Sequence, residues 1–527
     1  MVKLESDLRL IDQLVERIEY FLSQDKLFVQ IDGQNISGYR SPDAKSIWIR
    51  DYSDIIRGAR YFESDVMSVV QHFADTQAMN GRVFDYFTTY PEKLPCEREN
   101  WTKYVRVPVE ADVEYRFVKA AWICFQASGD IEWIKGLLPH LERAIEYSMS
   151  DPQRWDPDYQ LVKRPYTIDT WDFAYTAGKH DWLQFQIDDN TFWGIFHGDN
   201  TGVYEALLIL AKIRTLIGDD EGASNFTDKA LRLRQRINKV LWNGRFYDHF
   251  IKITPITIPD TDEVNQLSLS NPMAINRGVG NSEMAAAMIR EYQFRSDKDG
   301  SFAPWYSINP PFPDGVFGDE KLISGAYING GIFPLVGGEM ALMAFENGFE
   351  KYGLEQIMKY EKLSESNETF LWYFPDGSPS TEETSTSPDA SPTDGWGSST
   401  FLLSIIQGLA GITDLGFNFK SLRFAPRWAA AFSKRAKLSL SYPASGRKLD
   451  YTYLYEQDRM TFDLTGDFEK LDCHIYIPDH CRVTTVLMNS NPISFASSEI
   501  NESKYIDFEI EQAGKINITI HFDTLGS

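Results

Sequence analysis

Segments with a helical spacing of apolar residues come in pairs between residues 52 and 412, and this pattern constrains the fold more than any other feature of the chain. A short turn joins the members of a pair, and a longer polar and aromatic loop follows the second member. About twelve helices paired in this way predict a closed ring of helical hairpins, with the long loops gathered at one end. The expected pairs are 53–62 with 64–77, 112–127 with 130–149, 201–217 with 220–241, and 331–347 with 351–364, while 280–292 and 397–412 have no partner that the pattern identifies.

Two further segments complete the predicted organisation. Residues 1–45 are expected to form an N-terminal helix, over about 6–24, and an extended lead-in. The ring of hairpins is expected over 46–426. Alternating apolar and polar runs between 434 and 526 predict an antiparallel β-sandwich of about eight strands, in a structural domain at 427–527. In the 130–149 segment, Pro139 suits the first turn of a helix, so we expect that helix to begin there.

The charge balance restricts the partners. The chain has 52 Lys and Arg against 76 Asp and Glu, a net charge of −24. Such a field repels nucleic acids and anionic membranes, so we expect a small neutral carbohydrate or similar substrate and neither of those partners. The four cysteines form no CxxC motif, and no metal or organic cofactor is implied. The first residues are acidic and no long apolar stretch follows, which predicts a cytoplasmic protein; the oligomeric state is not indicated.

The stretch Trp48-Ile49-Arg50-Asp51 precedes an apolar helical pattern and has the side chains that bind sugars. A guanidinium donates forked hydrogen bonds, a carboxylate accepts bonds from hydroxyl groups, and an indole face packs on a sugar ring. The alternative is that Arg50 and Asp51 form an ion pair on the surface and that Asp51 or Ser53 caps the helix.

Two acidic loops could provide the chemistry. The first holds Asp169, Trp171 and Asp172 and runs on to a helix start at His197, Asp199 and Asn200; these last two could also be ordinary helix caps. A carboxyl group shielded by aromatic rings is desolvated, so it can retain a proton and act as a general acid. The second loop, 375–394, precedes Trp396; its Ser, Thr and Pro residues would alone suggest a linker. Glycoside hydrolysis requires two carboxyl groups on opposite faces of a sugar ring.

Four motifs in this order resemble the six-hairpin glycosidases, the superfamily of glucoamylases, trehalases, neutral invertases and α-L-rhamnosidases. They are Trp48-Ile49-Arg50-Asp51, Asp169-Thr170-Trp171-Asp172, Tyr327-Ile328-Asn329-Gly330-Gly331-Ile332-Phe333-Pro334 and Gly395-Trp396-Gly397-Ser398-Ser399. The resemblance covers roughly 46–426 and implies a mainly α fold, an (α/α)6 toroid followed by the small β-sandwich, and an inverting glycoside hydrolase. It makes Asp172 the general acid, and Arg50 and Asp51 the residues that hold the sugar in the −1 subsite. The expected sugar-binding residues are Trp48, Arg50, Asp51, Asp169, Trp171, His197, Asp199, Asn200, Trp305, Tyr327, Asn329 and Trp396.

The chain departs from the family pattern at both carboxyl groups. The acid is Asp, as in trehalases, where glucoamylases have Glu, and the loop expected to hold the base lacks a Glu-x-Tyr motif. Loop position alone therefore suggests the base, with Glu382 and Glu383 favoured and Asp376 and Asp394 left open.

Three other functions fit parts of this pattern. A phosphorylase of the same fold would use Ser398, Ser399 and Thr400 to bind phosphate. A protein that binds sugars without turnover would retain only the aromatic residues. An epimerase would require a histidine acid or base, for which His197 is the candidate.

Overall fold

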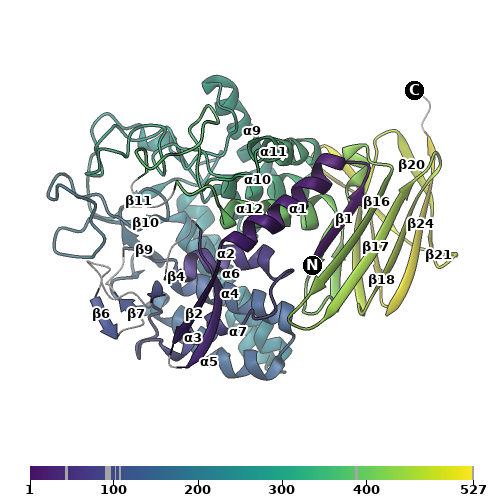
Figure 1. The fold of residues 1–527 in the computed structure, drawn as a ribbon, viewed down its shortest axis with the longest axis horizontal. Coiled ribbons are helices and arrows are strands. Elements are labelled where there is room, and N and C mark those ends of the chain that lie inside the picture. Colours follow the sequence, from purple (N-terminus) through teal and green to yellow (C-terminus); the bar gives the residue numbers. More distant parts are fainter. Residues whose placement is uncertain are drawn as a thin grey trace.

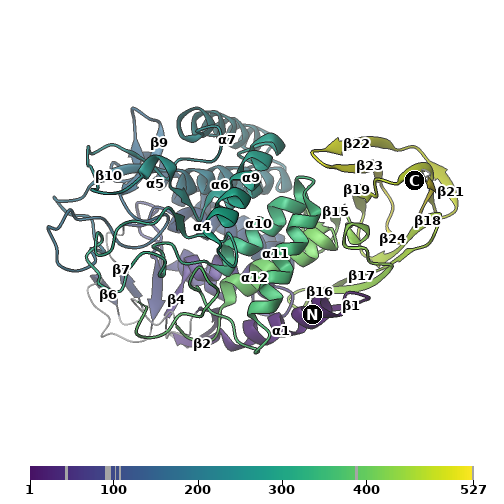
Figure 2. The same ribbon diagram turned by 90° about the horizontal axis from the view of Figure 1, so that it is seen from above.

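The computed structural model describes residues 1–31, 33–41, 46–88, 97–100, 103–105, 109–385 and 390–524. Its helices fill one part of the molecule and its two largest sheets lie beside them (Figures 1 and 2). The twelve α-helices of the described residues are α1 (Arg9–Gln24), α2 (Ile49–Ala59), α3 (Ser68–Asp75), α4 (Val113–Ser128), α5 (Ile131–Ser150), α6 (His197–Leu216), α7 (Asp220–Leu241), α8 (Asn271–Asn276), α9 (Ser282–Asp299), α10 (Pro334–Glu346), α11 (Glu350–Leu363) and α12 (Gly395–Leu403).

Every second helix belongs to a cyclic series of contacts. Helix α2 packs against α4, α4 against α6, α6 against α8, α8 against α10, α10 against α12, and α12 against α2 again. The remaining helices pack on the outside of this series, α5 and α7 on α6, α9 on α8 and α11 on α10. The contact between α12 and α2 is close, because a Cβ atom on Gly58 would lie 2.9 Å from the Ser399 hydroxyl. The contacts of α4 with α5, α6 with α7 and α10 with α11 agree with the expected pairs, whereas α3 packs on α4, α5 and β3 (Gln34–Tyr39) and not on its expected partner α2.

The structure supplies the two partners that the sequence pattern did not identify. Helix α9 packs against the short buried helix α8, and α12 packs against the N-terminal helix α1. Helix α12 continues into the π-helical turn η2 (Ser404–Leu409). The expected start of a helix at Pro139 is wrong, because α5 runs without a break from Ile131 and has Pro139 inside it. Asp130 caps this earlier start, since its carboxylate accepts a hydrogen bond from Trp133 N at 2.9 Å.

The strands of the two large sheets include segments from outside the expected C-terminal domain. Strand β1 pairs with β16, and β14 and β15 precede residue 427. Strands β15 and β19 pair in parallel, and the other neighbours are antiparallel. In spatial order, one sheet has β1 (Val2–Ser6), β16 (Arg435–Tyr442), β17 (Arg447–Tyr455), β18 (Arg459–Gly466), β24 (Gly514–Thr524), β20 (Cys481–Met488) and β21 (Asn491–Ile493), and the other has β14 (Ile412–Asp414), β15 (Ser421–Phe424), β19 (Lys470–Ile477), β23 (Ser503–Ile510) and β22 (Ala496–Ile500).

Smaller sheets lie in the loops that precede the inner helices, on the side of the helices away from the two large sheets (Figures 1 and 2). Two 3₁₀ turns, η1 (Glu263–Asn265) and η3 (Trp428–Ala431), complete the elements. The small sheets are β2 (Lys26–Ile31) with β3 (Gln34–Tyr39); β4 (Ser46–Trp48), β5 (Tyr86–Thr88), β7 (Lys103–Val105) and β6 (Glu97–Asn100); β11 (Phe250–Lys252), β10 (Trp193–Phe196), β9 (Leu161–Pro165) and β8 (Trp155–Asp156); and β12 (Leu267–Ser268) with β13 (Ile308–Asn309).

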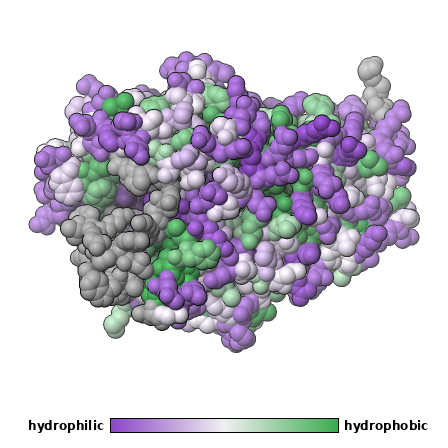
Figure 3. Space-filling view, viewed as in Figure 1, coloured by the Kyte–Doolittle hydropathy of each residue, from purple (hydrophilic) through white to green (hydrophobic). Residues whose placement is uncertain are grey.

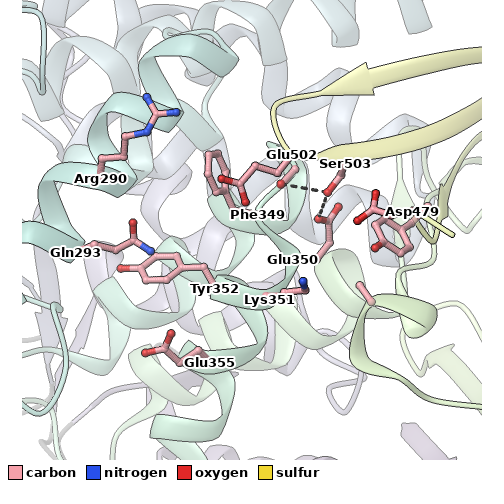
Figure 4. A pocket seen from close by; sticks show the side chains of 13 residues that line it. Arg290, Gln293, Phe349, Glu350, Lys351, Tyr352, Glu355, Asp479, Glu502 and Ser503 are labelled. Carbon is pink, nitrogen blue, oxygen red and sulfur yellow. Dashed lines mark hydrogen bonds between the residues drawn. The ribbon is translucent and has the colours of Figure 1, made fainter. Parts of the chain in front are cut away.

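The helical part and the sheets are joined by buried polar contacts. Glu350, at the start of α11, accepts a hydrogen bond from the Ser503 hydroxyl group of β23 (Figure 4) and another from the Tyr505 hydroxyl group of the same strand. The fully buried Arg427 forms an ion pair with Glu346 of α10 at 3.2 Å. Hydrophilic residues predominate on the outer surface in the view of Figure 3. Among the described residues, no helix has the length and apolar character that crossing a membrane requires. Cys124, Cys473 and Cys481 are free thiols, and Cys96 lies outside the described residues.

Candidate active site

The start of α2 holds its charged side chains in two separate ion pairs. Arg50 lies 3.1 Å from Asp112 and 3.5 Å from Glu110, while Asp51 pairs with Arg40. Arg50 and Asp51 therefore do not pair with each other, and both are buried rather than on the surface. The Trp48 ring stacks on Tyr86, with the ring centres 4.3 Å apart. The three residues of this motif are thus fixed at the amino end of an inner helix.

Asp169 anchors the first acidic loop. Its backbone has a φ of 47°, which is uncommon for a residue with a side chain. Its carboxylate accepts hydrogen bonds from Ser270 N at 3.0 Å, Ser270 Oγ at 2.7 Å and Thr170 N at 2.6 Å. Its own N–H donates to His249 Nε2 at 2.8 Å. Burial raises the pKa of Asp169, against these hydrogen bonds. All of its polar atoms form hydrogen bonds, as expected for a residue that holds the loop in place.

Arg164 and Asp112 position the next residues of this loop. Arg164 is fully buried, donates a hydrogen bond to Trp171 O at 2.5 Å and lies 3.3 Å from the Asp199 carboxylate. The Thr170 hydroxyl donates to Asp112 at 2.9 Å. None of the sequence motifs identified Arg164, Asp112 or Glu110 as part of the site. Glu110 and Asp112, the two acids just before α4, could have suggested it, but an acid at a helix start also fits an ordinary cap.

Asp172 follows directly and comes close to Arg50. Its side chain is half-buried, unlike that of Asp169. Burial lowers the pKa of Arg50, but the negative charges of Asp112, Glu110 and Asp172 outweigh that effect and raise it above the usual value. The Asp112 carboxylate, which contacts both Arg50 and Thr170, therefore brings the loop of the predicted acid to the Trp48–Asp51 motif, although about 120 residues separate them in the sequence.

Aromatic rings from three of the motifs meet beside Asp172. Trp171 Nε1 donates a hydrogen bond to the Tyr327 hydroxyl at 2.8 Å. The Trp171 ring lies edge-on to Tyr327 and to Trp396, with ring centres 5.1 and 6.0 Å apart. Trp396 Nε1 is buried and has no hydrogen-bond partner among the described residues. Four motifs that are far apart in the sequence therefore converge on one region.

Asp394 caps α12 next to this aromatic group. Its carboxylate accepts hydrogen bonds from Trp396 N and Gly397 N, each at 3.0 Å, and from the Ser41 hydroxyl at 3.0 Å. Burial raises the pKa of Asp394 to about 7, opposed by these hydrogen bonds and assisted by the charge of Asp51. A carboxyl group with a raised pKa binds protons more tightly in the folded chain than in the unfolded chain.

We therefore expect Asp394→Asn to flatten the pH dependence of stability. In the wild type, the contribution of Asp394 is fully present below the unfolded pKa of about 4 and is lost as the pH rises through about 7. Asn retains the capping function without the titration. Urea unfolding at pH 5, 6, 7 and 8 measures the slope. The matched control is Asp130→Asn, at the exposed cap of α5. Equal slopes in the wild type and Asp394→Asn would contradict this prediction.

Besides Asp169, five of the residues expected to bind sugar have at most 1% exposed surface, and most of their polar atoms are engaged inside the protein. Trp305 Nε1 donates to Gln356 at 2.9 Å. The Asn200 amide bonds to Val162 and Phe196, and the Asn329 amide to Phe312 and Leu322. His197 lies 3.1 Å from Ser268 Oγ, and burial lowers its pKa well below the usual value. In this structure they support the site and offer no surface to a ligand: His197, Asp199, Asn200, Trp305 and Asn329.

The second acidic loop is exposed where the favoured base candidates lie. Glu382 and Glu383 are both exposed, and Lys321 Nζ donates hydrogen bonds to Glu382 O and Ser385 O, each at 3.1 Å. Asp376 bonds to the neighbouring Ser378. Residues 386–389 of this loop lie outside the described residues. No contact of the described side chains joins Glu382 or Glu383 to Asp172, so the choice of base stays a prediction.

The hydroxyl groups considered for phosphate binding are used in helix packing. Ser398 Oγ donates to Asp394 O, and Ser399 Oγ donates to Asp54 O at 2.8 Å and accepts from Gly58 N at 2.8 Å. Thr400 bonds to backbone carbonyls of its own helix. Within the described part of the chain, no group of three or more His, Cys, Asp or Glu side chains is placed to hold a metal ion.

Solved glycoside hydrolases have a similar fold. An α-L-rhamnosidase from Dictyoglumus thermophilum aligns with a TM-score of 0.60 and 14% identity, over 99% of this chain and 50% of its own. A GH78 rhamnosidase of a Bacillus species gives 0.59 and 14%, over 90% and 42%. A GH63 mannosylglycerate hydrolase from Thermus thermophilus gives 0.52 and 12%, over 75% and 100%.

The chain thus spans half or less of the length of the rhamnosidases. No protein-family model matches it, and no curated protein matches it by sequence. At these identities the likeness is one of fold. The chain shares the fold of these solved glycoside hydrolases, in agreement with the resemblance that its four motifs carry.

Proposed function

We propose that the helices form an (α/α)6 toroid and that the two large sheets form a β-sandwich beside it. The cyclic contacts of α2, α4, α6, α8, α10 and α12 support the toroid, with α1 as the outer partner of α12. In this proposal the toroid covers 46–426 with α1 added and with β14 and β15 removed, and the sandwich covers 427–527 with β1, β14 and β15 added.

We propose that the chain is an inverting glycoside hydrolase that acts on a small neutral oligosaccharide or glycoside. The observation that carries this proposal is the half-buried Asp172 beside Arg50, next to the ring of Trp171. Trp171, Tyr327 and Trp396 form an aromatic cluster in which each residue is only 4–5% exposed, and Trp396 Nε1 is a donor without a partner among the described residues. A neutral substrate also suits the net charge of −24.

In the proposed mechanism, Asp172 donates its proton to the glycosidic oxygen as the bond to the anomeric carbon breaks. A carboxylate on the opposite face removes a proton from water, and that water attacks the anomeric carbon, so the anomeric configuration inverts. Arg50, held by Asp112 and Glu110, and Asp51, held by Arg40, would orient the sugar hydroxyl groups. The exposure of Glu382 and Glu383 leaves them able to reach water.

We expect Glu382→Gln or Glu383→Gln to lower turnover by at least about tenfold. This is less than the full effect of a general base, because the adjacent carboxylate can partly replace the missing one, and the double variant should lose more. The control is Glu365→Gln, which removes an exposed carboxylate outside the loop. Wild-type turnover in the double variant would exclude both residues and leave Asp376 and Asp394 as candidates.

The test of the proposed reaction is a screen of glycosides and disaccharides with NMR detection of the anomer formed first. An inverting hydrolase releases the opposite anomer, with or without phosphate. A phosphorylase would require phosphate, but the engaged hydroxyl groups of Ser398, Ser399 and Thr400 give it no support. Saturable sugar binding without any turnover would favour a binding protein. The cytoplasmic location and the absence of nucleic-acid and membrane partners stay predictions from composition.

A further inference from the structure

A cavity lies among α2, α4, α6, α8, α10 and α12, which we call the inner helices, at the end away from Arg50 and Asp112. Its volume is about 230 Å³, and all six inner helices line it together with the end of β14. Arg57 of α2 and Lys119 of α4 each lie two turns, about 10 Å, beyond the active-site residues Arg50 and Asp112 of the same helices. Lys212 and Leu415 are exposed at its edge. We call this space, at the carboxyl ends of the inner helices, the basic cavity.

The lining of the basic cavity has more cations than carboxylates. It includes Arg57, Arg60, Lys119, Lys212 and Arg277. The carboxylates are Glu205, Glu339 and Asp414. Burial raises the pKa of Asp414 to about 6, so this group is only partly ionised near that pH. The lining is therefore positive in a protein whose net charge is −24.

Several of these cations are incompletely paired. Arg57 pairs with Glu339, and Arg277 lies 3.4 Å from Glu205. Lys119 lies 3.8 Å from Glu205 and 3.7 Å from Asp54, a carboxylate that also pairs with Arg116. Arg60 and Lys212 form no ion pair with any described residue. Arg60 is 3% exposed, and its Nε has no hydrogen-bond partner among the described residues. Burial lowers the pKa of Lys119, and the neighbouring charges of Arg57 and Arg277 lower it further, against the effects of Glu205 and Asp54.

A cavity between the helices and the sheets shows the opposite balance. It has a volume of about 310 Å³ and lies around the start of α11 (Figure 4). Its only cations among the lining residues are Arg290 and Lys351, and its carboxylates are Glu350, Glu355, Asp479 and Glu502. We call it the acidic cavity. The excess of cations in the basic cavity is thus not shared by the acidic cavity.

We propose that the basic cavity binds one small oxyanion, of the size and charge of phosphate or sulfate. A guanidinium and an ammonium group donate charge-assisted hydrogen bonds to such an ion, and about 230 Å³ has room for it with some water. The anion would bring negative charge to Arg60, Lys119 and Lys212. This site is separate from the proposed sugar site, and the inference does not depend on the proposed hydrolysis.

The test is calorimetric titration of the full chain with inorganic phosphate and with sulfate, using chloride as the reference anion. We expect saturable binding of one phosphate or sulfate per chain. Lys212→Met and Arg60→Gln should each weaken that binding by about tenfold, the loss of one hydrogen bond to a charged group. Lys351→Met is the matched control, since it removes an exposed amine from the acidic cavity, and it should bind phosphate as the wild type does.

Thermal unfolding of each variant establishes that it is folded before titration. If Arg60→Gln does not fold, Lys212→Met on the exposed edge still decides the question. The cations could instead only offset the partial negative charge at the carboxyl ends of the six helices. In that case neither phosphate nor sulfate would bind saturably. That result, or equal affinities in the wild type, Lys212→Met and Lys351→Met, would overturn the proposal.

Discussion

Asp172→Asn is expected to fold as the wild type does and to lose at least about two orders of magnitude in turnover, the lower end of what a positioned general acid contributes. The amide has nearly the size of the carboxyl group and can still form hydrogen bonds, but it has no proton to transfer to the glycosidic oxygen. Asp172 is half-buried, so the substitution does not leave a fully buried group unpaired. The measurement is the turnover number on a glycoside found by the screen.

Two substrates with different leaving groups distinguish a general acid from a residue that only binds the sugar. A glycosyl fluoride leaves with little need of protonation, so Asp172→Asn should be far less impaired on the fluoride than on the glycoside. A residue that only holds the sugar would lose activity equally on both. Asp181→Asn, an exposed residue of the same loop, is the control and should retain wild-type activity. Near-wild-type turnover of Asp172→Asn on the glycoside would remove Asp172 as the acid.

Arg164→Met is expected to lower the free energy of unfolding by about 3–5 kcal/mol, the usual cost of leaving a buried charge without its partner. Arg164 and Asp199 are both fully buried, 3.3 Å apart, and the same guanidinium bonds to Trp171 O. The variant leaves the Asp199 carboxylate without its cation. Burial raises the pKa of Asp199 to about 6 even with Arg164 opposing it. Without Arg164 the acid should therefore protonate more readily, and the loss should be smaller at pH 5 than at pH 8.

Urea unfolding of the single and double variants tests this explanation. Arg164→Met combined with Asp199→Asn should recover part of the lost stability, because a neutral amide replaces the unpaired carboxylate. The control is Arg447→Met, which breaks an exposed ion pair with Asp467 and should cost less than about 1 kcal/mol. A loss in Arg164→Met as small as in this control would show that the buried pair does not stabilise the loop.

Where both helices of a hairpin are long, the sequence predicted them well. Helices α4, α6 and α7 lie within a few residues of the expected ranges, and α5 fills the expected 130–149 segment although its start was wrongly expected at Pro139. Each of these helices buries apolar residues over several turns. Helix α8 has six residues and is too short to show a period. The pairing of α12 with α1 could not be predicted from neighbouring segments, since these helices come from opposite ends of the chain.

The candidate site was predicted in part for a similar reason. Short motifs identified Arg50, Trp171, Asp172 and Trp396, and the structure brings these residues together. Local sequence does not reveal whether a polar residue points toward a ligand or into the protein. Trp305 and Asn329 stand among polar and aromatic neighbours, as a binding residue would, yet both are buried and bonded to the core. The fully buried Arg164 belongs to none of the four motifs, and its ion pair with Asp199 is apparent only in the folded chain.

The pairing of β1 with β16, and of α1 with α12, has a consequence for biosynthesis. The ribosome adds about 5–20 residues per second, and α1 and β1 precede their partners by several hundred residues. Both segments therefore remain without their native neighbours for tens of seconds after they are made. The apolar side of α1, with Ile11, Leu14 and Ile18, is exposed during that time and is a natural target for a chaperone that binds nascent chains.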